Sequence, residues 1–152
     1  MIIQQSKRVD SEFKMAKSLL YRLFGVGKIP ENLAAQLRVE GILISDEGIK
    51  GSVTYLNFRS PVRYANWKRQ WYTASIALTE TRLVGLRFSQ LIVNVPLADE
   101  RIRKMNCSLE ASGTFLVAFD ASLFHQDWSG KIEYRFRTDY VQALQDKLRE
   151  RI

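Results

Sequence analysis

The stretch WYTASIALTETRLVGLRFSQLIVNV (residues 71–95) carries the clearest strand pattern of this chain. It holds three short runs of apolar and β-branched residues, separated by the pairs Glu80-Thr81 and Ser89-Gln90: residues 72–79, 82–88 and 91–95. Short runs broken by turn sequences are typical of antiparallel strands joined as hairpins. Pro96 ends the third run, because proline cannot donate a hydrogen bond to a sheet.

The same pattern continues on both sides of this stretch. Four more runs have the length and alternation of strands: residues 49–58, 101–110, 114–120 and 131–137. Turn signals at 111–113 and 129–130 separate the later runs. The chain then ends in a segment with one apolar stripe at helical spacing, formed by Val141, Leu144, Leu148 and Ile152. The sequence therefore predicts a mainly β (α+β) fold, a seven-stranded antiparallel barrel or sandwich capped by a C-terminal helix.

The N-terminal residues have a different pattern. Asp10 or Ser11 can cap a helix over residues 14–24, and Pro30 fits the first turn of a second helix at 31–37. We therefore expect an N-terminal helical pair over residues 1–40 and a β domain over 41–152. In the β domain we expect an extra strand at 41–45, a tight turn at Asp46-Glu47-Gly48, and a long connection at 59–71.

The composition limits the classes of protein to consider. The 152 residues carry a net charge of +7 and one cysteine, Cys107, so an internal disulfide is excluded. The N-terminus has no apolar signal region, and no window of 18 apolar residues occurs. We expect a cytoplasmic protein, or one peripheral to a membrane.

The positive charge is concentrated in one part of the chain. Residues 48–79 contain five cations and no carboxylate. Within them, RSPVRYANWKRQWY (59–72) interleaves cations with aromatic residues, and its candidate ligand-binding residues are Arg59, Arg63, Tyr64, Trp67, Lys68, Arg69 and Trp71. Cations bind phosphate by charge and hydrogen bonds, and indole rings favour membrane interfaces or stack on bases. The alternative is a solvated surface with Tyr72 and its neighbours in packing roles.

Three segments resemble bacterial pleckstrin-homology (PH-like) and GRAM-like domains. IALTETRLVGL (76–86) is similar to their strand–turn–strand hairpin, and VPLADERI (95–102) to the link into their second sheet. Residues 113–119 followed by 130–136 are similar to their final hairpin. The resemblance covers residues 48–152. It implies seven strands with a capping helix, and it makes 59–71 the first inter-strand loop, where family members that bind phosphoinositides carry basic residues. This chain lacks the K/R-x-R triplet of that pattern.

Other candidate sites lack some of the residues that metal binding or catalysis would require. His125 lies near Asp120 and Asp127, but a metal site would want more nitrogen or sulfur ligands. Cys107 with His125 could in principle form a nucleophile–base pair, but the alternation of residues 102–109 favours a buried strand thiol for Cys107. Asp99 and Glu100 are adjacent, and adjacent residues of a strand face opposite sides.

We therefore expect a non-catalytic interaction module without a cofactor. Its partner would be a protein or an anionic lipid surface, reached through residues 59–72, with self-association through the N-terminal helices or a sheet edge as a further option. A small nucleic-acid-binding barrel is the alternative, and steep salt dependence of binding would identify it. An enzyme would need a pocket that gathers distant polar residues.

Overall fold

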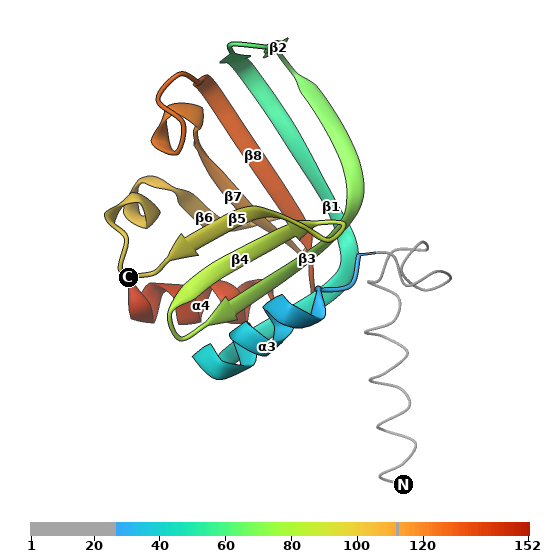
Figure 1. Ribbon diagram of the computed structural model, residues 1–152, viewed down its shortest axis with the longest axis vertical. Helices are drawn as coiled ribbons and strands as arrows, with labels where there is room; N and C mark the ends of the chain where they lie inside the picture. Colours follow the sequence, from blue (N-terminus) through green and yellow to red (C-terminus); the bar gives the residue numbers. More distant parts are fainter. Residues whose placement is uncertain (1–26, 112) are drawn as a thin grey trace, which may run out of the picture.

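Antiparallel strands make up most of the computed structural model, which describes residues 27–111 and 113–152 (Figure 1). The strands are β1 (Ile42–Ser60), β2 (Arg63–Ala65), β3 (Lys68–Thr79), β4 (Arg82–Arg87), β5 (Gln90–Pro96), β6 (Asn106–Glu110), β7 (Thr114–Asp120) and β8 (Ser129–Arg137). The helices of this part are α3 (Glu31–Glu40), α4 (Val141–Arg151) and the short 3₁₀-helices η1 (Glu100–Lys104) and η2 (Ala121–Leu123). The predicted mainly β fold with a C-terminal helix is confirmed.

All eight strands belong to one sheet, which curls into a half-barrel (Figure 1). Its order is β5-β4-β3-β1-β8-β7-β6, and β2 pairs with the far end of β1. Each neighbouring pair is antiparallel. Strands β5 and β6 are the two ends of this order, so the half-barrel stays open between them.

Strand β1 joins the two halves of the sheet. It is 19 residues long and continues where the sequence predicts a turn. The expected turn at 46–48 is wrong, since β1 runs through these residues with a shift of register against β3 between Glu47 and Ile49. Gly48 has a φ of 71°, as a glycine in a β-bulge can have. Asp46 is buried and accepts a hydrogen bond of 2.7 Å from the Thr138 hydroxyl. Residues 46–48, whose sequence is typical of a turn, thus form a bulge in β1, and the Asp46 carboxylate is a buried hydrogen-bond acceptor there.

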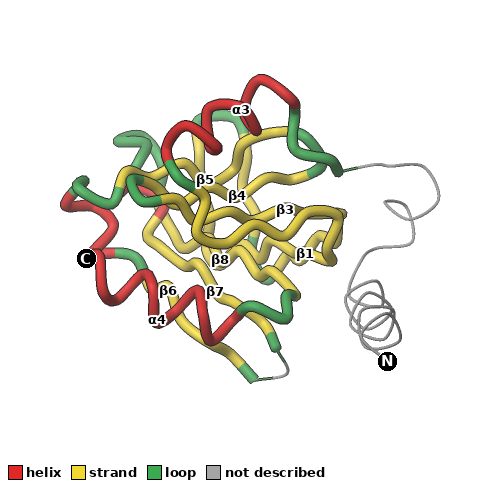
Figure 2. Tube along the Cα trace, turned by 90° about the horizontal axis from the view of Figure 1, so that it is seen from below, coloured by secondary structure: helices red, strands yellow, loops and turns green. Residues whose placement is uncertain are grey.

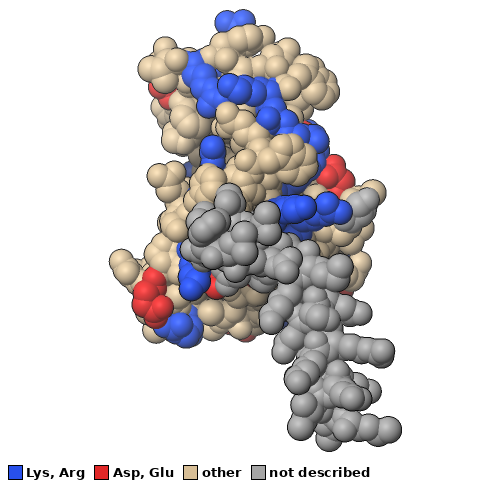
Figure 3. Space-filling view, turned by 90° about the vertical axis from the view of Figure 1, so that its right-hand side faces the viewer, with Lys and Arg blue, Asp and Glu red and all other residues tan. Residues whose placement is uncertain are grey.

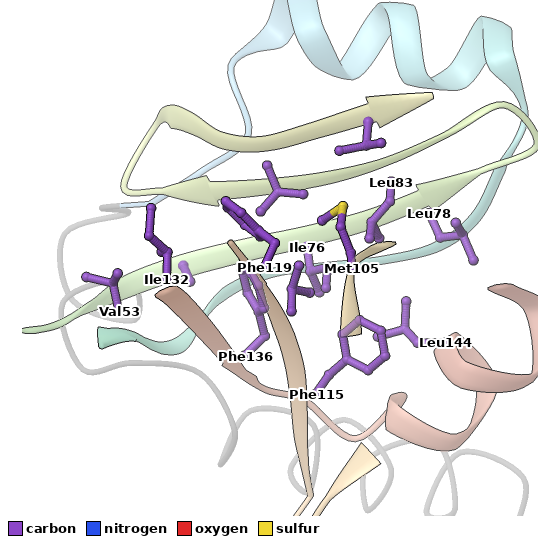
Figure 4. Close-up of a cluster of buried hydrophobic side chains, with 14 of the residues drawn as sticks. Val53, Ile76, Leu78, Leu83, Met105, Phe115, Phe119, Ile132, Phe136 and Leu144 are labelled. Carbon is purple, nitrogen blue, oxygen red and sulfur yellow. The ribbon is translucent and has the colours of Figure 1, made fainter. Parts of the chain in front are cut away.

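The core fills the concave side of the half-barrel (Figure 4). Alternate residues of every long strand point into it, including Val53, Ile76, Phe115, Ile132 and Phe136. Helix α4 closes one end with three residues of the predicted stripe, Val141, Leu144 and Leu148, all buried, whereas the fourth, Ile152, follows the helix and is exposed. The apolar stripe therefore has the same role that its spacing predicts.

Helix α3 lies on the outer face of the sheet, on a different side of the half-barrel from α4 (Figure 2). Leu37 is buried there against Ala77, Val84 and Leu86 of β3 and β4. The predicted helix at 31–37 is confirmed and is one turn longer, whereas the predicted helix at 14–24 lies outside the described residues. No helix in the described ranges is both long and apolar enough to span a membrane.

Three further boundaries differ from the sequence predictions. Residues 59–71 are not a long loop, because β1, β2 and β3 continue through most of them. Residues 101–104 are helical, because the Asp99 carboxylate caps η1 by accepting a hydrogen bond of 2.9 Å from the Arg101 amide. The expected turn at 129–130 is the start of β8, where Gly130 has a φ of 91° and a Cβ would collide with the carbonyl of Asn57.

Candidate functional site

The predicted basic-aromatic segment forms the end of the sheet that we call the tip, residues 55–69. Strand β2 folds back on β1, so that Phe58 pairs with Ala65, Arg59 with Tyr64, and Ser60 with Arg63. Phe58 and Ala65 are buried, and their pair faces the core. Because paired residues share a face and neighbours alternate, Arg59 and Tyr64 lie on the outer face of the tip.

The two turns of the tip expose apolar side chains. Val62, in the turn between β1 and β2, is 94% exposed, and Trp67, in the turn between β2 and β3, is 78% exposed. Trp67 has a φ of 54°, which is uncommon for a residue other than glycine. Asn66 supports this turn by accepting a hydrogen bond of 3.0 Å from the Asn57 amide. The fold thus holds two apolar groups in water at the edge of the molecule.

Four cations surround these apolar groups, and two of them are positioned by aromatic rings within the tip. The Arg59 guanidinium lies 4.8 Å from the centre of the Tyr64 ring, and that of Arg63 lies 4.7 Å from the Tyr55 ring. Lys68 and Arg69 follow at the start of β3. Among the described residues, no carboxylate lies within ion-pair distance of any of the four. Their charge is therefore available to an external anion.

Figure 3 shows the outer side of β1 and β3, with Lys and Arg side chains in a band across its upper half, toward the β2 end. The predicted patch is divided between the two faces of the tip. Arg63 lies toward the core side with Tyr55, and Arg59 stacks on Tyr64 on the other side. Tyr72 is not part of the surface, because it faces the core and burial raises the pKa of its hydroxyl well above the usual range.

Next to the tip, the outer face of the sheet forms a groove of about 380 Å³, which we call the outer groove. Its lining comes from five strands: Lys50, Gly51, Arg69, Trp71, Glu110, Thr114, Arg135 and Arg137. The register explains this grouping, since Ser52 of β1 pairs with Trp71 on one side and with Arg135 on the other. Four cations and one carboxylate therefore share one small surface.

Arg135 and Glu110 form the fixed part of the outer groove. Arg135 Nε and Nη2 donate to the Glu110 carboxylate over 2.8 and 3.1 Å, and Nη1 reaches the Thr54 hydroxyl over 3.4 Å. These hydrogen bonds hold the pKa of Glu110 below its usual range. On the other side Arg69 Nε donates to the same Thr54 hydroxyl over 2.9 Å, and its guanidinium lies 5.8 Å from the Trp71 ring centre.

Sequence patterns indicate two residues of this groove, Arg69 and Trp71, but they do not indicate Lys50, Arg135 and Arg137 as parts of a site. A partial signal was present, because KIEYRFR (131–137) places a charged residue at every second position, which puts these residues on one face of β8. Arg135 nevertheless lies 81 residues along the chain from Thr54, its hydrogen-bond partner on β1. Only the sheet order brings the cations of the groove together.

A second concavity, of about 360 Å³, opens between β5 and the segment that precedes β8. Its lining is largely apolar and aromatic, and the His125 ring stacks on Trp128 with 3.7 Å between ring centres. The Asp120 carboxylate caps η2 by accepting from the Ser122 amide and hydroxyl, and in the described part of the chain no three His, Cys, Asp or Glu side chains come together as a metal site would need. Burial raises the pKa of the Cys107 thiol to about 12, so it is protonated at neutral pH.

No protein-family model matches the sequence, and no curated protein matches it either. A function for this chain is therefore inferred from the geometry and charge of the surfaces described above.

Proposed function

We propose that this chain is a PH-like interaction module that docks on anionic membrane surfaces through the tip. The observation that carries the proposal is the exposure of Val62 and Trp67 among four cations that have no carboxylate partner in the described part of the chain. The architecture also supports it, since a seven-strand path closed by α4 at one end is what the resemblance to PH-like domains implies.

Two forces of similar size favour docking through the tip. Each basic side chain near an anionic membrane surface contributes about 1 kcal/mol. Insertion of apolar surface into the interfacial layer contributes about 25 cal/mol for each Å² removed from water, and tryptophan favours this layer in particular. A tip with two exposed apolar groups and four cations can use both forces together. Neither force requires a pocket, so two exposed turns are sufficient.

A vesicle co-sedimentation experiment tests this proposal. The wild-type chain should bind vesicles of phosphatidylcholine with 30% phosphatidylglycerol and should not bind vesicles of phosphatidylcholine alone. Changing Val62→Ser and Trp67→Ser together should weaken binding to the anionic vesicles. Val39→Ser is the matched control, because Val39 is 90% exposed but lies on α3.

Two results would contradict the proposal. Equal binding by the Val62→Ser/Trp67→Ser variant would show that the apolar groups do not insert. Displacement of the protein from vesicles by a short single-stranded oligonucleotide at equal charge would instead favour the nucleic-acid alternative, whose binding should fall steeply with salt.

A further inference from the structure

The outer groove has features that docking through the tip does not use. Lys50 and Arg137 lie beyond the tip, and both are exposed. Lys50 pairs with Thr73, five residues along β3 from Lys68, which places it about 16 Å from the start of that strand. A membrane that contacts Val62 and Trp67 would therefore leave Lys50 and Arg137 without a role.

The charges of the groove fit a compact anion with more than one negative charge. Arg135 pairs with two carboxylates, Glu110 over 2.8 Å and Glu133 over 3.4 Å, and Glu133 also pairs with Lys131 over 3.5 Å. The other three cations of the groove, Lys50, Arg69 and Arg137, have no ion pair in the ranges 27–111 and 113–152. Arg69 uses only Nε, so its two terminal nitrogens remain as donors. The groove thus presents three cations that no described carboxylate pairs with.

An unsatisfied donor lies beside the groove, buried and outside its lining. The Ser52 hydroxyl is fully buried and has no hydrogen-bond partner. It lies on the outer face between Trp71 and Arg135, because residues that pair across an antiparallel ladder share a face. Native structures rarely leave a buried hydroxyl unpaired, and such groups often lie where a ligand or water completes them.

We propose that the outer groove binds a phosphomonoester through Lys50, Arg69 and Arg137, with Trp71 as one wall. A phosphomonoester carries between one and a half and two negative charges at pH 7 and has three strong acceptor oxygens. Guanidinium groups match these oxygens with paired donors, and an ammonium adds a point charge. The Arg135–Glu110 pair keeps the groove in shape. The same chemistry occurs in soluble phosphate esters and in the headgroup of phosphatidic acid.

The test uses the full chain and two probes that share this phosphomonoester group. In the soluble arm, glycerol 3-phosphate is titrated while NMR follows the indole N–H of Trp71, assigned by its loss in Trp71→Phe, and the arginine Nε–H signals. In the lipid arm, binding to phosphatidylcholine vesicles with phosphatidic acid is compared with binding to vesicles of equal charge that contain phosphatidylglycerol, a phosphodiester.

We expect saturable binding of glycerol 3-phosphate, or tighter binding to the phosphatidic acid vesicles than to the phosphatidylglycerol vesicles. The arm that responds identifies the source of the phosphate. Lys50→Ala and Arg137→Ala should each weaken that binding about tenfold, as the loss of a charged hydrogen bond does. Glu110→Gln should strengthen it roughly twofold to fivefold, because a competing carboxylate is removed. A merely structural role of these residues would not produce a gain of affinity.

The proposal would be overturned if glycerol 3-phosphate did not bind and the phosphatidic acid vesicles bound no more tightly than the phosphatidylglycerol vesicles. A folded Lys50→Ala/Arg137→Ala variant that kept the wild-type response in the arm that binds would also overturn it. Dispersed amide spectra would establish that each variant is folded. The Val62→Ser/Trp67→Ser variant separates this proposal from docking by the tip. It should keep its affinity for glycerol 3-phosphate, whereas Lys50→Ala/Arg137→Ala should keep its binding to phosphatidylglycerol vesicles.

Discussion

Reversing two charges of the tip, with Arg63→Glu and Lys68→Glu in one variant, should abolish binding to anionic vesicles. Neither residue has an ion pair among the described residues, so the change breaks no native salt bridge. The variant does remove the stacking of the Arg63 guanidinium on the Tyr55 ring, at 4.7 Å from the ring centre. An exposed cation–π interaction of this kind is worth about 0.5–1 kcal/mol, so its removal leaves the fold intact.

The magnitude follows from the charge that is moved. The two substitutions change the charge of the tip by about four units, and each unit near an anionic surface is worth about 1 kcal/mol. Binding should therefore weaken by about 4 kcal/mol, or about a thousandfold. The effect should shrink as salt is raised, because the Debye length falls from about 10 Å at 0.1 M to about 3 Å at 1 M.

The assay is co-sedimentation with phosphatidylcholine vesicles that contain 30% phosphatidylglycerol, over a range of lipid concentrations. Arg103→Glu with Lys104→Glu is the matched control, since both residues are exposed on η1 and the change in net charge is the same. The control should bind nearly as well as the wild type. Equal losses in both variants would mean that net charge alone governs binding, and full binding by the Arg63→Glu/Lys68→Glu variant would refute the role of the tip.

Three further predictions concern stability and reactivity. Gly85→Ala should lower the free energy of unfolding by about 1–3 kcal/mol in a urea titration, because the new Cβ would lie 2.8 Å from Phe136 Cζ in the core, and unchanged stability would contradict the tight packing seen there. The Cys107 thiol should react with a disulfide reagent at pH 8 far more slowly in the native state than in guanidinium, since burial raises its pKa to about 12; equal rates would show that it is accessible. The pKa of Glu110 is lower in the folded state because of its hydrogen bonds with Arg135, so its contribution to stability is present above the unfolded pKa and is lost as pH falls through the folded value. Glu110→Gln should therefore make the stability less sensitive to pH between about 5 and 3, and an unaltered acid dependence would count against this pair.

Much of the fold could be predicted because its signals are local. Thr114–Asp120 forms a strand with the predicted bounds, and Val141–Arg151 forms the predicted helix. In both, the spacing of apolar residues along the chain is enough to identify the element, since one face must be buried whatever it packs against. Local signals are misleading at Asp46 and Gly48. Their sequence is typical of a turn, but a hydrogen bond from Thr138 to Asp46, 92 residues apart in the chain, keeps them in a strand.

The candidate sites also depend partly on local sequence signals and partly on tertiary contacts. The amino-acid sequence alone shows that residues 59–72 are basic and aromatic, and that charged residues alternate along 131–137. It could not tell that Arg59 and Arg63 lie on opposite faces, because the two-residue turn and the pairing of β2 with β1 decide this. It also could not place Lys50, Arg69 and Arg137 in one groove. Strand order and register decide which distant residues become neighbours, and both are set by the burial of the whole core rather than by any one segment.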